Sequence, residues 1–363
     1  MFDIPARIRR LRAELAAKEL DALLVSQPEN RRYLSGFTGS AGFVIVSQRE
    51  TLLLSDFRYM TQAPQQAPEY EFIRIERGFP RQGMKPILER VTGRRIGFEA
   101  GHMSVAGHAH WLEGVQDSGL PVELVPTEGI VEGLRAVKDN EKLRILAEAV
   151  RIVDDAFAKL RQGLKPGMTE REVAWKLEQL VREEGAEALS FPTIIASGPN
   201  AAKPHHGISQ REIQAGEPIV CDFGAKYEGY CSDITRTICI GQPQGRFNEI
   251  YELVLKAQLT AEQRILPGIE AKVGDQYARE VITDAGYGEQ FGHGLGHGVG
   301  LEVHEAPTMG PSGELELAPA MAVTVEPGVY LPDWGGVRIE DICFVRQNGL
   351  EVVNRASKDP IVK

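Results

Sequence analysis

An internal repeat is the feature that most restricts how the second part of this chain can fold. Residues 164–168 (LKPGM) and 265–269 (ILPGI) lie 101 residues apart, and each precedes a segment with helical spacing of apolar residues. Each segment is followed by a β-like run that ends in a carboxylate, at 218–224 and at 322–328. We therefore expect a duplicated helix–hairpin unit, with two pairs of carboxylate-bearing strands around a pseudo-two-fold axis.

Four acidic residues of these strands are candidates for chemistry. Asp222 and Asp233 flank a turn signal at 226–229 (KYEG), so a hairpin would bring them onto neighbouring strands. Glu326 and Glu340 occupy similar strand-like runs in the second copy. A lone carboxylate buried among such apolar residues costs several kcal/mol, so the four negative charges need compensation. Two divalent cations would balance all four.

Two arginines offer an alternative explanation for these acids. Arg236 and Arg338 lie in the same runs and could form ion pairs with two of the four carboxylates. Such pairs would leave two negative charges unbalanced. A repeated pattern of four acids therefore favours a paired metal site over two structural ion pairs.

A glycine-rich segment gathers three of the eight histidines within twelve residues. His293 and His297 stand in the run 292–300 (GHGLGHGVG), and His304 follows. The alternating glycines disfavour a helix, so we expect extended chain with residues 293, 295 and 297 on one face. The glycines would permit close approach to a ligand or metal. One imidazole and four carboxylates form a hard donor set that suits Mn²⁺, Co²⁺ or Zn²⁺.

The first part of the chain has the pattern of a small α/β unit. Short apolar runs bounded by turn residues predict strands at 22–25, 42–46, 51–54 and 96–99. The stretch 36–42 (GFTGSAG) lacks the lysine of a phosphate-binding loop and indicates a turn. A stretch rich in turn residues then leads into a long helical pattern. We expect an α/β domain over residues 1–130 and an α+β domain over residues 131–363.

Composition excludes several classes of protein. Hydrophobic residues make up 42% and charged residues 25%, as in globular proteins, and the net charge of −10 disfavours nucleic acid and anionic membranes as partners. No signal-peptide pattern or membrane-spanning run is visible, so we expect a cytoplasmic protein. No C-x-x-C pair occurs, and we expect buried free thiols at Cys221, Cys231, Cys239 and Cys343.

The motifs together resemble one family. Residues 135–355 are similar to the pita-bread metallopeptidases, the family of aminopeptidase P, prolidase and methionine aminopeptidase. The motifs are DFG (222–224), SDITRT (232–237), HGLGH (293–297), VEPGVY (325–330) and RIED (338–341). The first part resembles the N-terminal domain that accompanies aminopeptidase P, prolidase and creatinase, best at 30–39 and 54–59. The resemblance implies an α/β domain followed by an α+β pita-bread catalytic domain.

The same resemblance implies two divalent metal ions per chain, with Mn²⁺ favoured and Co²⁺ or Zn²⁺ as alternatives. Glu326 would also accept a proton from the bridging water. The implied metal ligands are Asp222, Asp233, His297, Glu326 and Glu340.

Further residues match the substrate side of the family's site. His205, His293 and His304 match histidines near the substrate, with His304 against the scissile carbonyl. Tyr330 and Arg338 match residues that orient ligands or substrate. Where the family has a small residue after the first of these histidines, this chain has His206. The choice between the two adjacent histidines therefore stays open.

The implied activity is that of an Xaa-Pro aminopeptidase, in which a metal-bridging hydroxide attacks the bond before a proline at the second position. The alternative is prolidase, which cleaves Xaa-Pro dipeptides. The metal motifs do not discriminate between them, and the compact length and the GFTGSAG stretch favour aminopeptidase P. More remote alternatives are a metal-free creatinase-like hydrolase and a non-catalytic binding module, which would have lost ligands. We expect proline-containing peptides as partners, and a homodimer.

Overall fold

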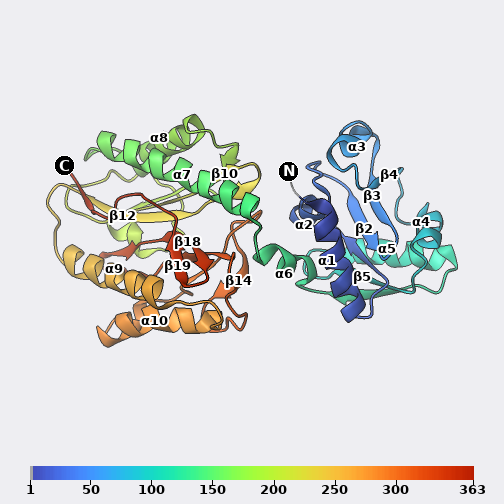
Figure 1. Ribbon diagram of the computed structural model, residues 1–363. Coiled ribbons are helices and arrows are strands. Elements are labelled where there is room, and N and C mark those ends of the chain that lie inside the picture. Colours follow the sequence, from blue (N-terminus) through green and yellow to red (C-terminus); the bar gives the residue numbers. More distant parts are fainter. Residues whose placement is uncertain (1–2) are drawn as a thin grey trace. The chain divides into compact units, whose positions relative to one another are not determined.

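The computed structural model describes residues 3–363, and the chain divides into two compact units between Arg135 and Ala136 (Figure 1). This division lies near the end of helix α6 (Ile130–Ala136), whereas the sequence places the boundary at the start of that helix. Among the described residues, no helix has the length and apolar character needed to cross a bilayer.

The first unit is built on a six-stranded sheet with the order β4-β3-β2-β1-β5-β6. Strand β2 runs antiparallel to its two neighbours, and the other pairs are parallel. The strands are β1 (Ala22–Val25), β2 (Phe43–Ser47), β3 (Thr51–Ser55), β4 (Glu71–Arg74), β5 (Arg95–Glu99) and β6 (Glu123–Thr127). All four predicted strands of this unit are present.

Helices cover this sheet with apolar side chains. Leu24 and Ile45 are paired across β1 and β2, and they share a buried core with Leu88 and Trp111. The helices before α6 are α1 (Ile4–Ala17), α2 (Pro28–Ser35), η1 (Phe57–Tyr59), α3 (Gln62–Gln66), α4 (Met84–Val91) and α5 (Val105–Ser118). The first unit is therefore an α/β domain, as predicted.

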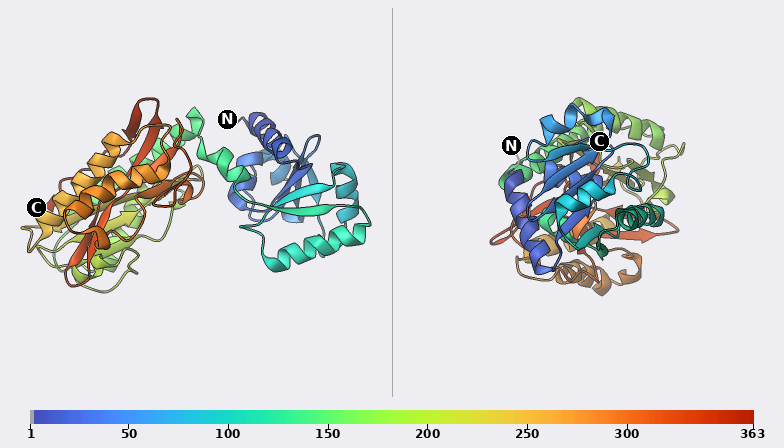
Figure 2. Two further views of the ribbon diagram at one scale, coloured as in Figure 1. Left: turned by 90° about the horizontal axis from the view of Figure 1, so that it is seen from below. Right: turned by 90° about the vertical axis from the view of Figure 1, so that its right-hand side faces the viewer.

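The second unit contains the predicted repeat, and Figure 2 shows the helices of its first copy in green and those of its second copy in orange. Helices α8 (Glu170–Glu183) and α10 (Ala271–Asp284) both have 14 residues and begin 101 positions apart. Gly167 and Gly268 precede them with φ angles of 89° and 88°, a left-handed conformation that favours glycine. The other helices are α7 (Asn140–Gly163), η2 (Gly198–Ala202), α9 (Phe247–Arg264) and η3 (Gly288–Gln290).

Each half of the repeat contributes most strands of one main sheet. The strand orders are β20-β12-β9-β8 in the first half and β14-β13-β15-β18-β19 in the second. Strands of the first half are β7 (Ala188–Leu189), β8 (Ile194–Ser197), β9 (Ile219–Phe223), β10 (Ala225–Tyr227), β11 (Tyr230–Cys231) and β12 (Ile234–Ile240). Strands of the second half are β13 (Gly296–Gly298), β14 (Glu305–Met309), β15 (Ala322–Val325), β16 (Gly328–Leu331), β17 (Gly335–Arg338), β18 (Asp341–Arg346), β19 (Gly349–Val352) and β20 (Ile361–Val362).

The strand pairings place the acidic residues of the two halves in comparable positions. The predicted turn joins β10 and β11 through Glu228 and Gly229, both with positive φ. Asp233 then directly precedes β12, and Glu340 directly precedes β18. Burial of these strands is nearly complete, and the four cysteines are buried free thiols, as predicted.

Candidate active site

The predicted site residues converge on one pocket of the second unit, with a volume of about 620 Å³. The first half of the repeat supplies Asp222 and Asp233, and the second half supplies Glu326 and Glu340. Nine of the ten predicted site residues line this pocket: His205, Asp222, Asp233, His293, His297, His304, Glu326, Arg338 and Glu340. The tenth, Tyr330, contacts two of these residues from β16.

Five of these side chains form two overlapping groups of potential metal ligands. Ligand atoms of Asp222, Asp233 and Glu340 all lie within 4.8 Å of one another. The same holds for His297, Glu326 and Glu340. Glu340 belongs to both groups, so the two groups share one carboxylate. The donor set of oxygens and an imidazole nitrogen matches the preferences of Mn²⁺, Co²⁺ and Zn²⁺.

Each carboxylate of the first group has one buried oxygen to which no described residue donates a hydrogen bond. Asp222 Oδ1, Asp233 Oδ1 and Glu340 Oε1 are buried without a hydrogen-bond partner among residues 3–363. Burial and neighbouring carboxylates raise the pKa of Asp233 and of Glu340 well above their ordinary values. Burial also raises the pKa of Asp222. Such groups require a compensating cation, so the residues present fit a pair of divalent ions.

His297 and Glu326 stabilise each other's charged forms. His297 Nε2 lies 3.2 Å from Glu326 Oε1. Burial opposes both charges, but this contact raises the pKa of His297 and lowers that of Glu326 to about 2. The contact with His297 therefore favours the ionised form of Glu326, which is one of the residues that line the pocket.

Two threonines orient these ligands, and neither was predicted from the sequence. Thr235 Oγ1 donates to Glu340 Oε2 at 2.8 Å. Thr324 Oγ1 donates to Glu326 Oε1 and accepts a hydrogen bond from the backbone N–H of His297, both at 3.0 Å. Each threonine lies two positions from an acidic ligand in the sequence. Residues two apart share a face of a strand, and this spacing could have identified them.

The two arginines have different roles. Arg338 Nη2 donates to Asp222 Oδ2 at 2.5 Å, and its Nη1 donates to the Tyr330 hydroxyl at 2.7 Å. Arg236 instead pairs with Asp341, which is not one of the four acids. Arginines therefore offset only one of the four negative charges, and the alternative of two structural ion pairs is wrong.

The other histidines of the glycine-rich segment also reach the pocket. His293 Nε2 lies 3.0 Å from the Tyr330 hydroxyl, and the His304 ring lies 4.3 Å from the His297 ring. Burial lowers the pKa of His293 and of His304, which favours neutral imidazoles that can donate hydrogen bonds to a substrate. His304 also forms a third possible ligand group with Asp233 and His297.

One expectation for the glycine-rich segment is wrong. Residues 293, 295 and 297 do not share one face, since only 296–298 form a strand and Leu295 packs in the core. The glycines have a role in packing. A Cβ on Gly296 would meet the Thr324 carbonyl oxygen at 2.3 Å, and a Cβ on Gly298 would meet that of Ala306 at 2.1 Å. The glycines allow close contact with neighbouring strands.

The adjacent histidines 205 and 206 have different surroundings. His206 Nε2 lies 2.9 Å from Glu170 Oε2, and its side chain is only 8% exposed. His205 is exposed and lines the pocket. This geometry favours His205 as the substrate-side histidine, and that role stays a prediction. Glu170 belongs to none of the motifs that indicated the site.

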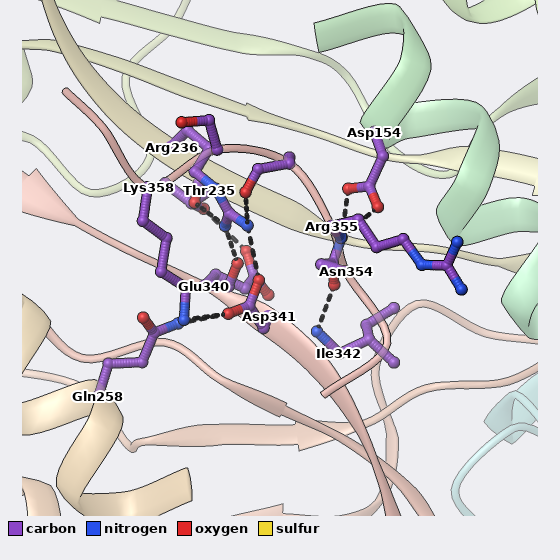
Figure 3. A network of polar contacts seen from close by, with 12 residues as sticks. Asp154, Thr235, Arg236, Gln258, Glu340, Asp341, Ile342, Asn354, Arg355 and Lys358 are labelled. Carbon is purple, nitrogen blue, oxygen red and sulfur yellow. Dashed lines mark hydrogen bonds and ion pairs between the residues drawn. The ribbon is translucent and has the colours of Figure 1, made fainter. Parts of the chain in front are cut away.

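A second polar cluster lies behind the site, next to Glu340 (Figure 3). Asp341 Oδ1 accepts a hydrogen bond from Arg236 at 2.7 Å, and its Oδ2 lies 2.6 Å from Lys358 Nζ. Arg236 Nη1 also donates to the backbone oxygens of Thr235 and Glu340. The cluster therefore ties β12 of the first half to β18 of the second half, at residues that closely follow Asp233 and Glu340 in the chain.

Comparisons with known proteins agree with this arrangement. Residues 144–347 match metallopeptidase family M24, and residues 7–137 match the creatinase/prolidase N-terminal domain. A solved structure described as an Xaa-Pro dipeptidase from Bacillus anthracis is 40% identical with a TM-score of 0.95, covering 99% of this chain and 100% of that one. The Xaa-Pro dipeptidase of Pyrococcus horikoshii is 35% identical, covering 98% of each chain.

A solved X-Pro aminopeptidase from Thermotoga maritima is also similar, at 35% identity and a TM-score of 0.88, covering 98% of this chain and 99% of that one. Both kinds of peptidase therefore share the fold of this chain along nearly its full length. These likenesses confirm the predicted α/β domain followed by a pita-bread catalytic domain.

Proposed function

The chain belongs to metallopeptidase family M24, with a creatinase/prolidase N-terminal domain, and from this premise we propose that it is an Xaa-Pro dipeptidase. The observation that carries the proposal is the cluster of four carboxylates, three of them buried, and His297, with three unpartnered oxygens at a pocket of about 620 Å³. Relatives that match over nearly the whole chain and are described as Xaa-Pro dipeptidases support this substrate class.

The sequence by itself favours the longer peptides of an aminopeptidase, and the named relatives favour dipeptides instead. Because a solved X-Pro aminopeptidase from Thermotoga maritima is also similar, aminopeptidase activity is the second candidate function. Both reactions break the same bond. They differ in whether the substrate continues beyond the proline, so the length of the peptide separates them.

Five side chains would hold the metal pair: Asp222, Asp233, His297, Glu326 and Glu340. Two divalent ions, when bound, lower the pKa of a water molecule and polarise a carbonyl. We favour Mn²⁺, with Co²⁺ and Zn²⁺ as alternatives, because the donors are mainly oxygens.

The chain's own residues would orient the peptide and move the proton. Glu326, an ionised carboxylate in the pocket, would accept a proton from the attacking water. His205 and His304 would donate hydrogen bonds to the scissile carbonyl as its oxygen gains charge. Apolar lining residues, including Phe191 and Ile208, would contact the pyrrolidine ring.

Tyr330 and Arg338 would keep this arrangement in place. The Tyr330 hydroxyl contacts both His293 and Arg338, and Arg338 in turn holds Asp222. Fixing the orientation of a ligand and of a neighbouring histidine is the usual task of residues behind a metal centre.

The test compares an Xaa-Pro dipeptide with an Xaa-Pro tripeptide after loading with Mn²⁺, Co²⁺ or Zn²⁺. We expect kcat/KM to be at least about tenfold higher for the dipeptide. A preference for the tripeptide would establish the aminopeptidase instead, and no hydrolysis of either with any of the three metals would refute both. Light scattering of the same sample tests the homodimer, which we also propose.

A further inference from the structure

The segment that carries His205 has no regular structure of its own. Residues 203–211 belong to no helix or strand, although they border the pocket. Backbone and side-chain polar groups in such a segment need partners elsewhere, and the position of the segment depends on those partners. On the pocket side, the carbonyl oxygen of Pro204 lies 3.4 Å from Arg338 Nη1.

On the opposite side, one buried carboxylate contacts the chain both before and after His205. Glu170 Oε1 accepts hydrogen bonds from Ser197 N at 2.8 Å, Ser197 Oγ at 2.9 Å and Asn200 Nδ2 at 3.0 Å. Glu170 Oε2 contacts His206 Nε2 at 2.9 Å and Ser209 Oγ at 2.6 Å, and it accepts from Ser209 N at 3.3 Å. One oxygen therefore binds the chain before His205, and the other binds the chain after it.

Glu170 stays charged in spite of its burial. Its side chain is fully buried, and such a carboxylate is costly unless hydrogen bonds satisfy it. Burial raises its pKa, but the hydrogen bonds from Ser209, Asn200 and Ser197 outweigh burial and lower it below the ordinary value. Glu170 is also the first residue of α8, where the helix dipole favours a negative charge.

The repeat shows that the helix itself does not need this carboxylate. The equivalent first residue of α10 is Ala271, which is also buried. The backbone contacts of the two helix starts are the same, since Glu170 N donates to the Arg211 carbonyl and Ala271 N donates to that of Leu315. The glutamate therefore distinguishes the half of the unit that carries the His205 segment.

We propose that Glu170 is a positioning residue, which fixes residues 197–209 through Ser197, His206 and Ser209 so that His205 faces the substrate pocket. This inference rests on the proposed peptidase function. It also gives His206 a task, as the link between the segment and Glu170. A displacement of about 1 Å in a substrate-side group lowers a rate by about 100-fold, so the effect is measurable.

The experiment uses Glu170→Ala, which copies the second half of the repeat, in the full metal-loaded chain. We expect kcat/KM for an Xaa-Pro dipeptide to fall by about 10- to 100-fold, with an unchanged metal content. The key readout is a double-mutant cycle with His205→Ala: in that background, Glu170→Ala should cause less than about a threefold further loss. Full additivity of the two losses would overturn the proposal, because a merely structural glutamate acts independently of His205.

Hydrogen exchange separates this proposal from the proposed function. Even if the wild-type protein cleaves no dipeptide, the amides of residues 203–210 should exchange at least about tenfold faster in Glu170→Ala. An unchanged exchange rate there would overturn the proposal. Glu99→Gln is the matched control, because Glu99 is another buried glutamate with several donors, in the first unit. It should leave both kcat/KM and exchange at 203–210 unchanged.

A milder variant covers the case in which Glu170→Ala does not fold. Ser209→Ala removes the 2.6 Å hydrogen bond and leaves the other donors to Glu170 in place. We expect about a 3- to 10-fold loss of kcat/KM, which again disappears in the His205→Ala background. An equal loss in both backgrounds would contradict the proposal.

Discussion

Glu340 and Asp341 are neighbours in the chain, yet they lie in opposite kinds of polar environment (Figure 3). Asp341 is paired with Arg236 and Lys358, so the chain supplies its counter-charges. Glu340 receives one hydrogen bond from Thr235, and its Oε1 has no partner in the part of the chain described. This difference is the one expected between a buried acid that stabilises the fold and a buried acid that binds an ion. Both oxygens of Asp341 have cationic partners, whereas Glu340 is oriented by one hydrogen bond and keeps one oxygen available for a ligand.

Neutralising Glu340 should produce the largest effect on activity. Glu340→Gln keeps the shape of the side chain but removes the charge shared by both ligand groups. We expect at least about a 1,000-fold loss of kcat/KM, since paired ions contribute several kcal/mol to stabilising the transition state. Metal analysis should find fewer than two ions per chain. A variant that keeps both ions and a tenth of the activity would contradict the proposed role of Glu340 as a metal ligand.

Neutralising Asp341 should affect stability first. Asp341→Asn leaves the buried Arg236 without its ion pair, and the loss of one partner of a buried pair costs about 3–5 kcal/mol. Urea unfolding of Asp341→Asn and Glu340→Gln, both stripped of metal, measures the contrast. The first should have a much lower free energy of unfolding than the wild type, and the second should not. Equal losses in both variants would show that the two acids play the same role.

Removing the metal should destabilise the protein more at pH 8 than at pH 5.5. The raised pKa values of Asp233 and Glu340 mean that the stripped folded state binds more protons than the unfolded state, so its stability falls as pH rises. Bound ions take the place of these protons and stabilise by about 3 kcal/mol at 100 times Kd. Thermal melts of loaded and stripped protein at both pH values test this. A difference in Tm that stays constant with pH would contradict it.

Among these predictions, the replacement of Glu262 should have the smallest effect, and the effect is on stability alone. Burial, with the charge of Asp341, raises its pKa to about 7. An unfolded glutamate has a pKa of about 4.3, so between that pH and about pH 7 the folded state binds more protons than the unfolded state. The free energy of unfolding therefore falls as the pH rises through this range. Glu262→Gln should remove this fall and stabilise the protein at pH 8 by about 1–2 kcal/mol, with little change at pH 4.5. Urea titrations at the two pH values measure the difference, and equal stability of variant and wild type at pH 8 would contradict the assignment.

The sequence predicted the ligand-bearing strands because their pattern is local. A run of apolar residues that ends in an acid, at 218–224 and again 104 positions later at 322–328, indicates both the fold and the paired site. The partners of Asp341 could not be predicted in this way. Lys358 and Arg236 lie far from it in the sequence, and only the pairing of β20 with β12 and the packing of the two halves bring them together. Glu170 escaped prediction for the same reason.

The glycine-rich segment shows a different limit. Its glycines predict extended chain in place of a helix, which the structure confirms, and the structure adds that they allow the close approach of Thr324 and Ala306. Leu295 lies outside the short strand β13 and packs in the core, and the spacing of the residues does not reveal this. The alternating glycines and histidines therefore identify the histidines that line the pocket. They do not show whether a residue between them, such as Leu295, lies in the pocket or in the core.

The division of the four acids between the halves of the repeat has a consequence for the integrity of the pocket. Asp222 and Asp233 come from one half, and Glu326 and Glu340 come from the other. Neither half by itself holds all four acids, so the cluster exists only where the two halves pack against each other. The halves also differ at the start of the repeated helix, where one has Glu170 and its counterpart has Ala271. The likeness of the halves therefore brings the acids together, and the difference between them places a buried glutamate next to the His205 segment alone.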